Sequence, residues 1–299
     1  MRSLPLALLL AGATSLAAGC SSTTDVPDNT PGADATIGDT TTDAETDTAS
    51  TDATIDDATM EDTSMDDTAT EDGGEACDTT TRVVTFETED GVMLTADLQL
   101  GDDARGAVVL AHMIPPSWDR TSYPQGIRDH IADLGYVVLN IDRRGAGDSS
   151  GAAVDAYEGP GGRLDIEAAV RFLSDLPTSC GADMNRLALV GASNGTTSTM
   201  DYAVGHADDL PDVSRIIWLS PGAYTENQNS VDDNLDTLST IPLLFVHPDS
   251  EPWSTGFAEN TPEAWAIVEL ANGQHGTRNF ESPDLEAQTL SAMDAILSP

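Results

Sequence analysis

The chain has 299 residues and a formal net charge of −40, and its 12 basic residues are all arginine. This length suits one large domain or two small ones. A surface this acidic repels nucleic acid and anionic membranes, so the composition argues against nucleic-acid binding.

The N-terminus has the pattern of an export signal. Arg2 is followed by an apolar run over 4–10 that is too short to span a bilayer as a mature helix, so residues 1–19 are predicted to be a signal peptide. The small residues before Cys20 resemble the lipobox of bacterial lipoproteins, which implies lipidation of Cys20. Because Ser21 and not Asp follows, the resemblance favours the outer membrane or cell surface. Ordinary cleavage near Ala18 is the alternative.

A long acidic segment follows the signal. Residues 20–76 are mostly Thr, Asp, Ala, Ser and Glu, with 17 acidic residues, no arginine and no aromatic residue after Cys20. Such a segment cannot bury enough apolar surface to offset the entropy of ordering, so it is predicted to be disordered. We expect it to act as a tether that holds a soluble domain away from a membrane.

Residues 77–299 have the pattern of one folded α/β domain. Strands are predicted at 82–89, 92–100, 107–112, 136–141, 187–190, 216–219, 243–246 and 265–270, and helices at 126–134, 164–176, 196–204 and 285–297. The run 265–270 fits either state, and a strand is expected because one is due there. Strands that alternate with helices predict a mostly parallel sheet of about eight strands, covered by helices on both faces. In such sheets the ligand site lies at the carboxyl ends of the strands.

Two cysteines fall within this domain. Cys77 and Cys180 are far apart in sequence and lack the spacing of a zinc site. An exported chain meets an oxidising compartment, so a single disulfide between them is plausible. It would join the start of the domain to the loop before the strand at 187–190. No metal or cofactor is implied by the sequence.

The segment 191–195, Gly-Ala-Ser-Asn-Gly, carries the strongest chemical signal. It is a G-x-S-x-G motif directly after a strand-like run and directly before a helix-like one, which is the context of a nucleophile elbow. The turn strains the backbone of Ser193, and the small Gly191 and Gly195 let the strand and the helix approach. We therefore predict that Ser193 is a nucleophile.

A serine hydroxyl needs a base, and the base needs an acid that orients it. His275 lies in a glycine-flanked loop between the last predicted strand and the last helix, where a Ser, acid, His order would place the base. The acid should follow the strand at 243–246, where Asp249 and Glu251 are both available. In an extended chain these two side chains would point the same way, so the residues alone leave the choice open.

The oxyanion would need two backbone donors. The N–H of Asn194 is one, and the second should come from the loop after the strand that ends at His112. Met113 or Ile114 is the candidate, because the two prolines that follow have no N–H.

Other residues near the predicted rim have less definite roles. Arg143 and Arg144 follow the strand at 136–141 and either brace their loop or meet an anionic substrate. Five aromatic residues fall in loops at the carboxyl-end rim, where some could line an acyl pocket: Trp118, Tyr123, Tyr157, Tyr224 and Trp253. About twenty polar residues separate the strands at 216–219 and 243–246, which predicts an open site without a large cap.

Together these motifs resemble those of the α/β-hydrolases, over residues 80–299. The matching stretches, in chain order, are H-M-I-P-P at 112–116, D-R-R-G-A-G-D-S at 142–149, G-A-S-N-G at 191–195, H-P-D-S-E-P at 247–252 and G-Q-H-G at 273–276. The resemblance implies Ser193 as nucleophile, His275 as base and Glu251, in place of the commoner Asp, as acid. It also suggests a lidless branch similar to dienelactone hydrolase or prolyl oligopeptidase.

The sequence thus predicts an exported, lipid-anchored serine hydrolase that acts on an ester or related small acyl substrate. Two alternatives remain open. The chain could be a surface lipoprotein that keeps the fold as a binding module with a decayed site, or a peptidase of the same fold.

Overall fold

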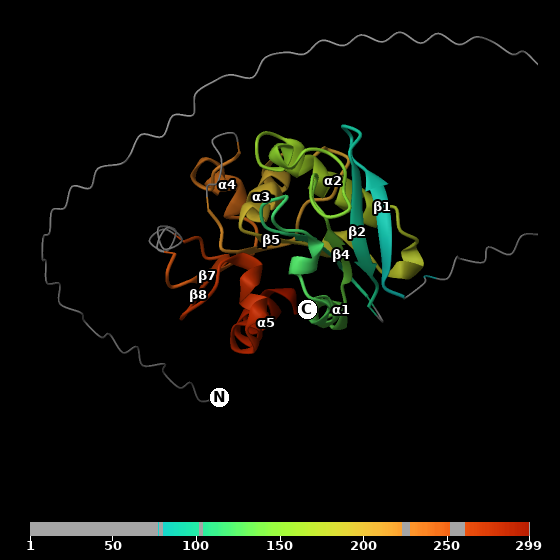
Figure 1. Ribbon diagram of the computed structural model, residues 1–299. Coiled ribbons are helices and arrows are strands. Elements are labelled where there is room, and N and C mark those ends of the chain that lie inside the picture. The colour runs from blue at the N-terminus through green and yellow to red at the C-terminus, as the bar shows by residue number, and fades with distance from the viewer. Residues whose placement is uncertain (1–76, 78–79, 102–103, 223–227, 252–260, 299) are drawn as a thin grey trace, which may run out of the picture. The chain divides into compact units, whose positions relative to one another are not determined.

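The computed structural model describes residues 77, 80–101, 104–222, 228–251 and 261–298, which form an α/β domain (Figure 1). The eight strands are β1 (Arg82–Glu87), β2 (Met93–Gln99), β3 (Ala107–Ala111), β4 (Val137–Ile141), β5 (Leu187–Ala192), β6 (Arg215–Leu219), β7 (Leu243–Pro248) and β8 (Trp265–Leu270). The predicted strands are all present, including the ambiguous run at 265–270. The predicted α/β class is confirmed.

The strands form one sheet in the order β1-β2-β4-β3-β5-β6-β7-β8. β2 runs antiparallel to both of its neighbours, and every pair from β4 to β8 is parallel. β3, β4 and β5 are buried along their whole length, as expected of parallel strands covered on both faces. The carboxyl ends of β3, β5, β6 and β7 therefore lie at one edge of the sheet.

Helices cover both faces of this sheet (Figure 1). The α-helices are α1 (Gln125–Asp133), α2 (Gly161–Ser174), α3 (Asn194–Gly205), α4 (Leu235–Leu238) and α5 (Pro283–Leu297). α2 and α3 contribute Ile166, Val170 and Met200 to the core on one face. α1 and α5 contribute Ile127 and Met293 to the core on the other. The single turn α4 was not predicted from the sequence.

A disulfide fixes the start of the described domain. Cys77 is bonded to Cys180, with 5.1 Å between the Cα atoms and 103 residues between the two positions. The bond joins the chain just before β1 to the segment before β5. Among the residues that the structure describes, none of the helices is long and apolar enough to cross a membrane.

Candidate active site

Ser193 lies on a sharp turn between β5 and α3. Its backbone has φ 50° and ψ −122°, a positive φ that side-chain-bearing residues rarely adopt. The Ser193 N–H donates to the carbonyl of Leu219 at 2.8 Å, which attaches the turn to the end of β6. A strained residue held this firmly between a strand and a helix is typical of a functional position.

Two glycines make this turn sterically possible. A Cβ on Gly191 would lie 2.6 Å from the carbonyl oxygen of Gly195. A Cβ on Gly195 would lie 2.4 Å from the carbonyl oxygen of Ala111 and 2.5 Å from that of His112. Any larger residue would push α3 away from the ends of β3 and β5, so the spacing of the motif follows from the packing.

His275 lies between the serine and a carboxylate. Its Nε2 is 2.7 Å from Ser193 Oγ, and its Nδ1 is 2.5 Å from Glu251 Oε1. The ionised Glu251 can only accept, so Nδ1 carries the proton and Nε2 is left to accept from the hydroxyl. Ser193 is 6% exposed, and the side chains of His275 and Glu251 are 36% and 16% exposed. The three groups thus form one hydrogen-bonded line that solvent reaches at the imidazole.

Of the two candidate acids, Glu251 contacts the histidine. The chain turns directly after β7, where the Glu251 N–H donates to the carbonyl of Pro248 at 3.1 Å. Asp249 lies in this turn with its side chain exposed. The sequence analysis considered an extended chain here, whereas residues 249–250 form a turn.

The loop that carries His275 is fixed by two residues that the sequence analysis did not identify. Ser220, which follows β6 with φ 56°, accepts a hydrogen bond from the Gly276 N–H at 2.9 Å. Asn279 accepts from the Gln274 N–H at 2.8 Å and donates to the Gly276 carbonyl at 3.2 Å. Only their positions in the sequence could have indicated these two residues. Ser220 directly follows a strand, and Asn279 lies four residues after His275.

The loop after β3 reaches the same site. Met113 is buried, and a Cβ on Gly276 would lie 2.6 Å from Met113 Sδ, so this loop packs against the turn after His275. Ile114 is 38% exposed. On the other side, α3 begins at Asn194, whose N–H is one of the first helical donors without a partner inside the helix. Asn194 therefore directly follows Ser193, and the loop that carries Met113 borders the turn after His275.

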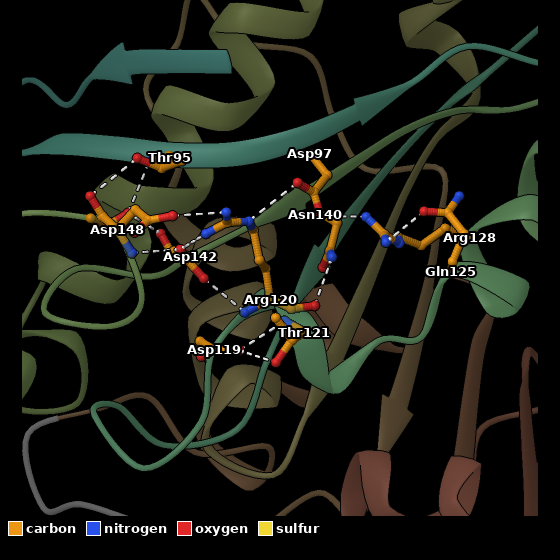
Figure 2. Close-up of polar contacts among 11 residues, drawn as sticks. Thr95, Asp97, Asp119, Arg120, Thr121, Gln125, Arg128, Asn140, Asp142 and Asp148 are labelled. Atoms are coloured by element: carbon orange, nitrogen blue, oxygen red, sulfur yellow. Dashed lines mark hydrogen bonds and ion pairs between the residues drawn. The ribbon is translucent and has the colours of Figure 1, made fainter. Parts of the chain in front are cut away.

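An ion-pair network ties two loops together at this edge (Figure 2). The Arg120 guanidinium pairs with Asp142, with Asp97 at 3.2 Å and with Asp148 at 2.8 Å. Its backbone N–H donates to Asp142 Oδ1 at 2.8 Å. Burial raises the pKa of Asp142, while hydrogen bonds from Arg120 and Asp148 oppose this shift. The network joins the loop after β3 to the loop after β4 and to β2.

Neither arginine of the loop after β4 is available to an anionic substrate. Arg143 is fully buried and Arg144 is nearly so. Arg144 pairs with Asp165 at 2.8 Å and with Asp90 at 2.7 Å. Of the two roles that the sequence left open, the structure supports bracing of the loop.

Two cavities adjoin the site. One, of about 110 Å³, has a mostly apolar lining that includes Thr196, Met200, Trp218 and Val231, and it begins one turn of α3 beyond Ser193. The other, of about 360 Å³, is lined by residues that include Trp118, Thr277 and Phe280. Trp118 therefore lines a cavity on the side of the His275 loop.

Two of the other aromatic residues expected at the rim, Tyr123 and Tyr157, are among the described residues. Tyr123 is fully buried, which raises its pKa, and its hydroxyl donates to the carbonyl of Ala111, so it belongs to the core. Tyr157 is half-buried. Tyr224 and Trp253 lie outside the described residues, as does Cys20. Within the described part of the chain, no group of side chains has the arrangement of a metal site.

The mostly parallel sheet, with a serine on the turn between its fifth strand and the following helix, is an α/β-hydrolase fold, and the described residues hold no cap domain. No protein-family model matches the sequence, and no curated protein matches it either.

Solved structures share this fold with the chain at low sequence identity. An esterase from Pyrococcus furiosus aligns with a TM-score of 0.57 and 16% identity over 73% of this chain and 90% of that one. An α/β hydrolase from Novosphingobium aromaticivorans aligns with a TM-score of 0.55 and 15% identity, over 73% and 98% of the two chains. A dienelactone hydrolase from Anabaena variabilis aligns with a TM-score of 0.52 and 15% identity, over 72% and 95%. At these identities the likeness establishes the fold.

Proposed function

We propose that this protein is a serine hydrolase that cleaves an ester or related acyl substrate, with Ser193 as nucleophile, His275 as base and Glu251 as the acid. The observation that carries the proposal is the hydrogen-bonded line from Ser193 Oγ through His275 to Glu251 Oε1, at 2.7 Å and 2.5 Å. A serine, a histidine and a carboxylate in this order are the functional parts of the known catalytic triads. The esterases and the dienelactone hydrolase among the structural neighbours support the same reaction class.

The reaction follows from the geometry. Ser193 Oγ attacks the acyl carbon while its proton passes to His275 Nε2, and Glu251 stabilises the resulting imidazolium. The N–H of Asn194 and an N–H of Met113 or Ile114 hold the tetrahedral oxyanion. Collapse releases the alcohol, which takes the proton from His275. A water molecule then loses a proton to His275 and attacks the acyl carbon, and the bond to Ser193 Oγ breaks as Oγ takes that proton back, which releases the carboxylic acid and restores the serine hydroxyl.

The cavity of about 110 Å³ beside α3 supports a small acyl group as substrate. Its lining by Met200, Trp218 and Val231 favours an apolar chain, and its volume favours a short one. Assays with esters of graded acyl length measure this preference for chain length, and kcat/KM should be highest for short acyl chains. A preference for long chains would assign the acyl group to another part of the surface.

Ser193→Ala tests the proposed function. Wild-type protein should react with a fluorophosphonate and hydrolyse a short p-nitrophenyl ester, and the variant should do neither. Wild-type protein that does neither would indicate that the fold serves as a binding module. Faster cleavage of an aminoacyl amide than of the matched ester would indicate a peptidase.

We also propose that the domain is exported and lipid-anchored through Cys20, at the outer membrane or cell surface. The proposal depends on the sequence of residues 1–76, which lie outside the described residues. The disulfide between Cys77 and Cys180 supports an oxidising compartment. Metabolic labelling with a palmitate analogue should mark the wild-type chain and leave Cys20→Ser unmarked.

A further inference from the structure

Arg143 is a buried cation that the proposed reaction does not use. Its neighbour Arg144 is neutralised by two carboxylates, at 2.7 Å and 2.8 Å. The hydrogen bonds of the Arg143 side chain within the described residues go instead to neutral acceptors: the carbonyls of His112, Met113 and Ala156 at 3.4 Å, 3.4 Å and 2.7 Å, and Ser198 Oγ at 2.8 Å. Burial lowers the pKa of Arg143 to about 10, so it stays charged at neutral pH. Burying a charge carries a large desolvation penalty, so the Arg143 guanidinium should exert a strong field on the groups that it contacts.

One of those groups is the carbonyl of Met113. It accepts from Arg143 Nη1 at 3.4 Å and from His112 Nδ1 at 2.7 Å. His112 Nε2 accepts the Arg143 N–H at 2.9 Å, so the ring proton is on Nδ1. Burial lowers the pKa of His112 to about 3, which keeps the imidazole neutral. Two buried side chains therefore fix this carbonyl.

The direction of that carbonyl sets the direction of the next N–H. The cis peptide in the described residues is Pro115–Pro116, so the bond between Met113 and Ile114 is trans. In a trans peptide the C=O and the N–H point in opposite directions. Because the Met113 carbonyl points toward these two buried side chains, the Ile114 N–H points away from them.

We propose that Arg143 is a positioning residue that orients and polarises the peptide between Met113 and Ile114, so that the Ile114 N–H, and not that of Met113, donates to the oxyanion. The inference rests on the proposed function. A cation on the carbonyl draws electron density from the N–H of the same peptide and strengthens the bond that it donates. The donor is also oriented before the substrate arrives, which is how backbone donors stabilise such charge.

The charge and the hydrogen bonds of Arg143 can be separated by two variants. Arg143→Gln keeps donors and loses the charge, and Arg143→Lys keeps the charge. In steady-state hydrolysis of p-nitrophenyl acetate, Arg143→Gln should lower kcat by roughly tenfold, with KM within about twofold of wild type. Arg143→Lys should recover most of kcat. Arg163→Gln is a matched control, because Arg163 donates to the carbonyl of Gly205 at the far end of α3, and its kcat should equal that of wild type.

A second experiment does not depend on how well the Arg143 variants fold. Replacing Ile114 by its α-hydroxy acid removes one N–H from the full-length chain, and kcat should fall by roughly 100-fold. The same replacement at Met113 should leave kcat within about threefold of wild type.

A larger loss of kcat at Met113 than at Ile114 would overturn the assignment of Ile114, and equal kcat for the Gln and Lys variants of Arg143 would overturn the role of its charge. Wild-type protein without esterase activity would overturn the proposed function and this inference with it, whereas the other outcomes leave the proposed function standing.

Discussion

The substitution Gly195→Ala tests whether close packing of α3 on β3 holds the site together. The new Cβ would lie 2.4 Å from the Ala111 carbonyl oxygen and 2.5 Å from that of His112, where ordinary contacts begin at 3.4 Å. Both neighbours are backbone atoms, one at the end of the buried strand β3 and one in the buried residue that follows it, so no flexible side chain can yield. Either α3 or the end of β3 must therefore move by about 1 Å.

Such a movement separates the groups that would flank the oxyanion of the proposed reaction. Ser193 and Asn194 move with α3, whereas Met113 and Ile114 move with β3. A displacement of about 1 Å at reacting groups costs on the order of 100-fold in rate, and overpacking costs about 1–3 kcal/mol of stability. We expect Gly195→Ala to lower kcat for a p-nitrophenyl ester about 100-fold and to lower the Tm measured by circular dichroism.

Gly205→Ala provides the matched control. Gly205 ends the same helix, and a Cβ there would meet nothing within 4 Å. Alanine favours the helix by about 0.5–1 kcal/mol over glycine, so this variant should be at least as stable as wild type and fully active. If Gly195→Ala matched Gly205→Ala in kcat and Tm, the packing argument would be refuted.

Three further predictions concern the acid, the disulfide and the stability at low pH. Glu251→Gln should lower kcat about 100-fold or more, whereas Asp249→Asn should stay within about twofold of wild type in the same ester assay. Cys77→Ser should lower the free energy of unfolding in urea by roughly 2–5 kcal/mol, because the bond closes a loop of 103 residues, and an unchanged midpoint would contradict this. Hydrogen bonds from Arg144 lower the pKa of Asp90 to about 2, so their stabilisation is present above about pH 4 and is lost as the pH falls toward 2. Asp90→Asn should therefore cost at most about 1 kcal/mol at pH 7, since the carboxylate is partly exposed, and progressively less in urea titrations as the pH falls through 2.

The elements of this fold were predictable because their signals are local. Continuous apolar runs mark β3, β4 and β5, and two glycines around Ser193 mark a turn whose geometry permits little else. The order of the strands in the sheet could not be predicted from such local signals. β4 lies between β2 and β3 in the sheet, and that placement depends on contacts between segments far apart in sequence.

The side chains around the site were predictable to a lesser degree. Asp249 and Glu251 are two carboxylates in one short loop, and a single backbone turn decides which of them meets His275. Ser220 takes its role from a hydrogen bond with Gly276, which lies 56 residues further along the chain. The sequence located the residues of the candidate site, whereas the residues that orient them depend on tertiary contacts.

The pair Arg143 and Arg144 illustrates the same limit. Their side chains are identical and adjacent, yet one is neutralised by Asp90 and Asp165 and the other contacts neutral oxygens. Those carboxylates lie 54 and 21 residues from Arg144 in the sequence, so the dipeptide itself contains no sign of the difference. In a chain of net charge −40, a buried cation that bonds directly to no carboxylate among the described residues is the exceptional case. Its contact with the Met113 carbonyl, in the loop after β3, supports our proposal of a field directed at negative charge that develops during the reaction and is absent from the resting protein.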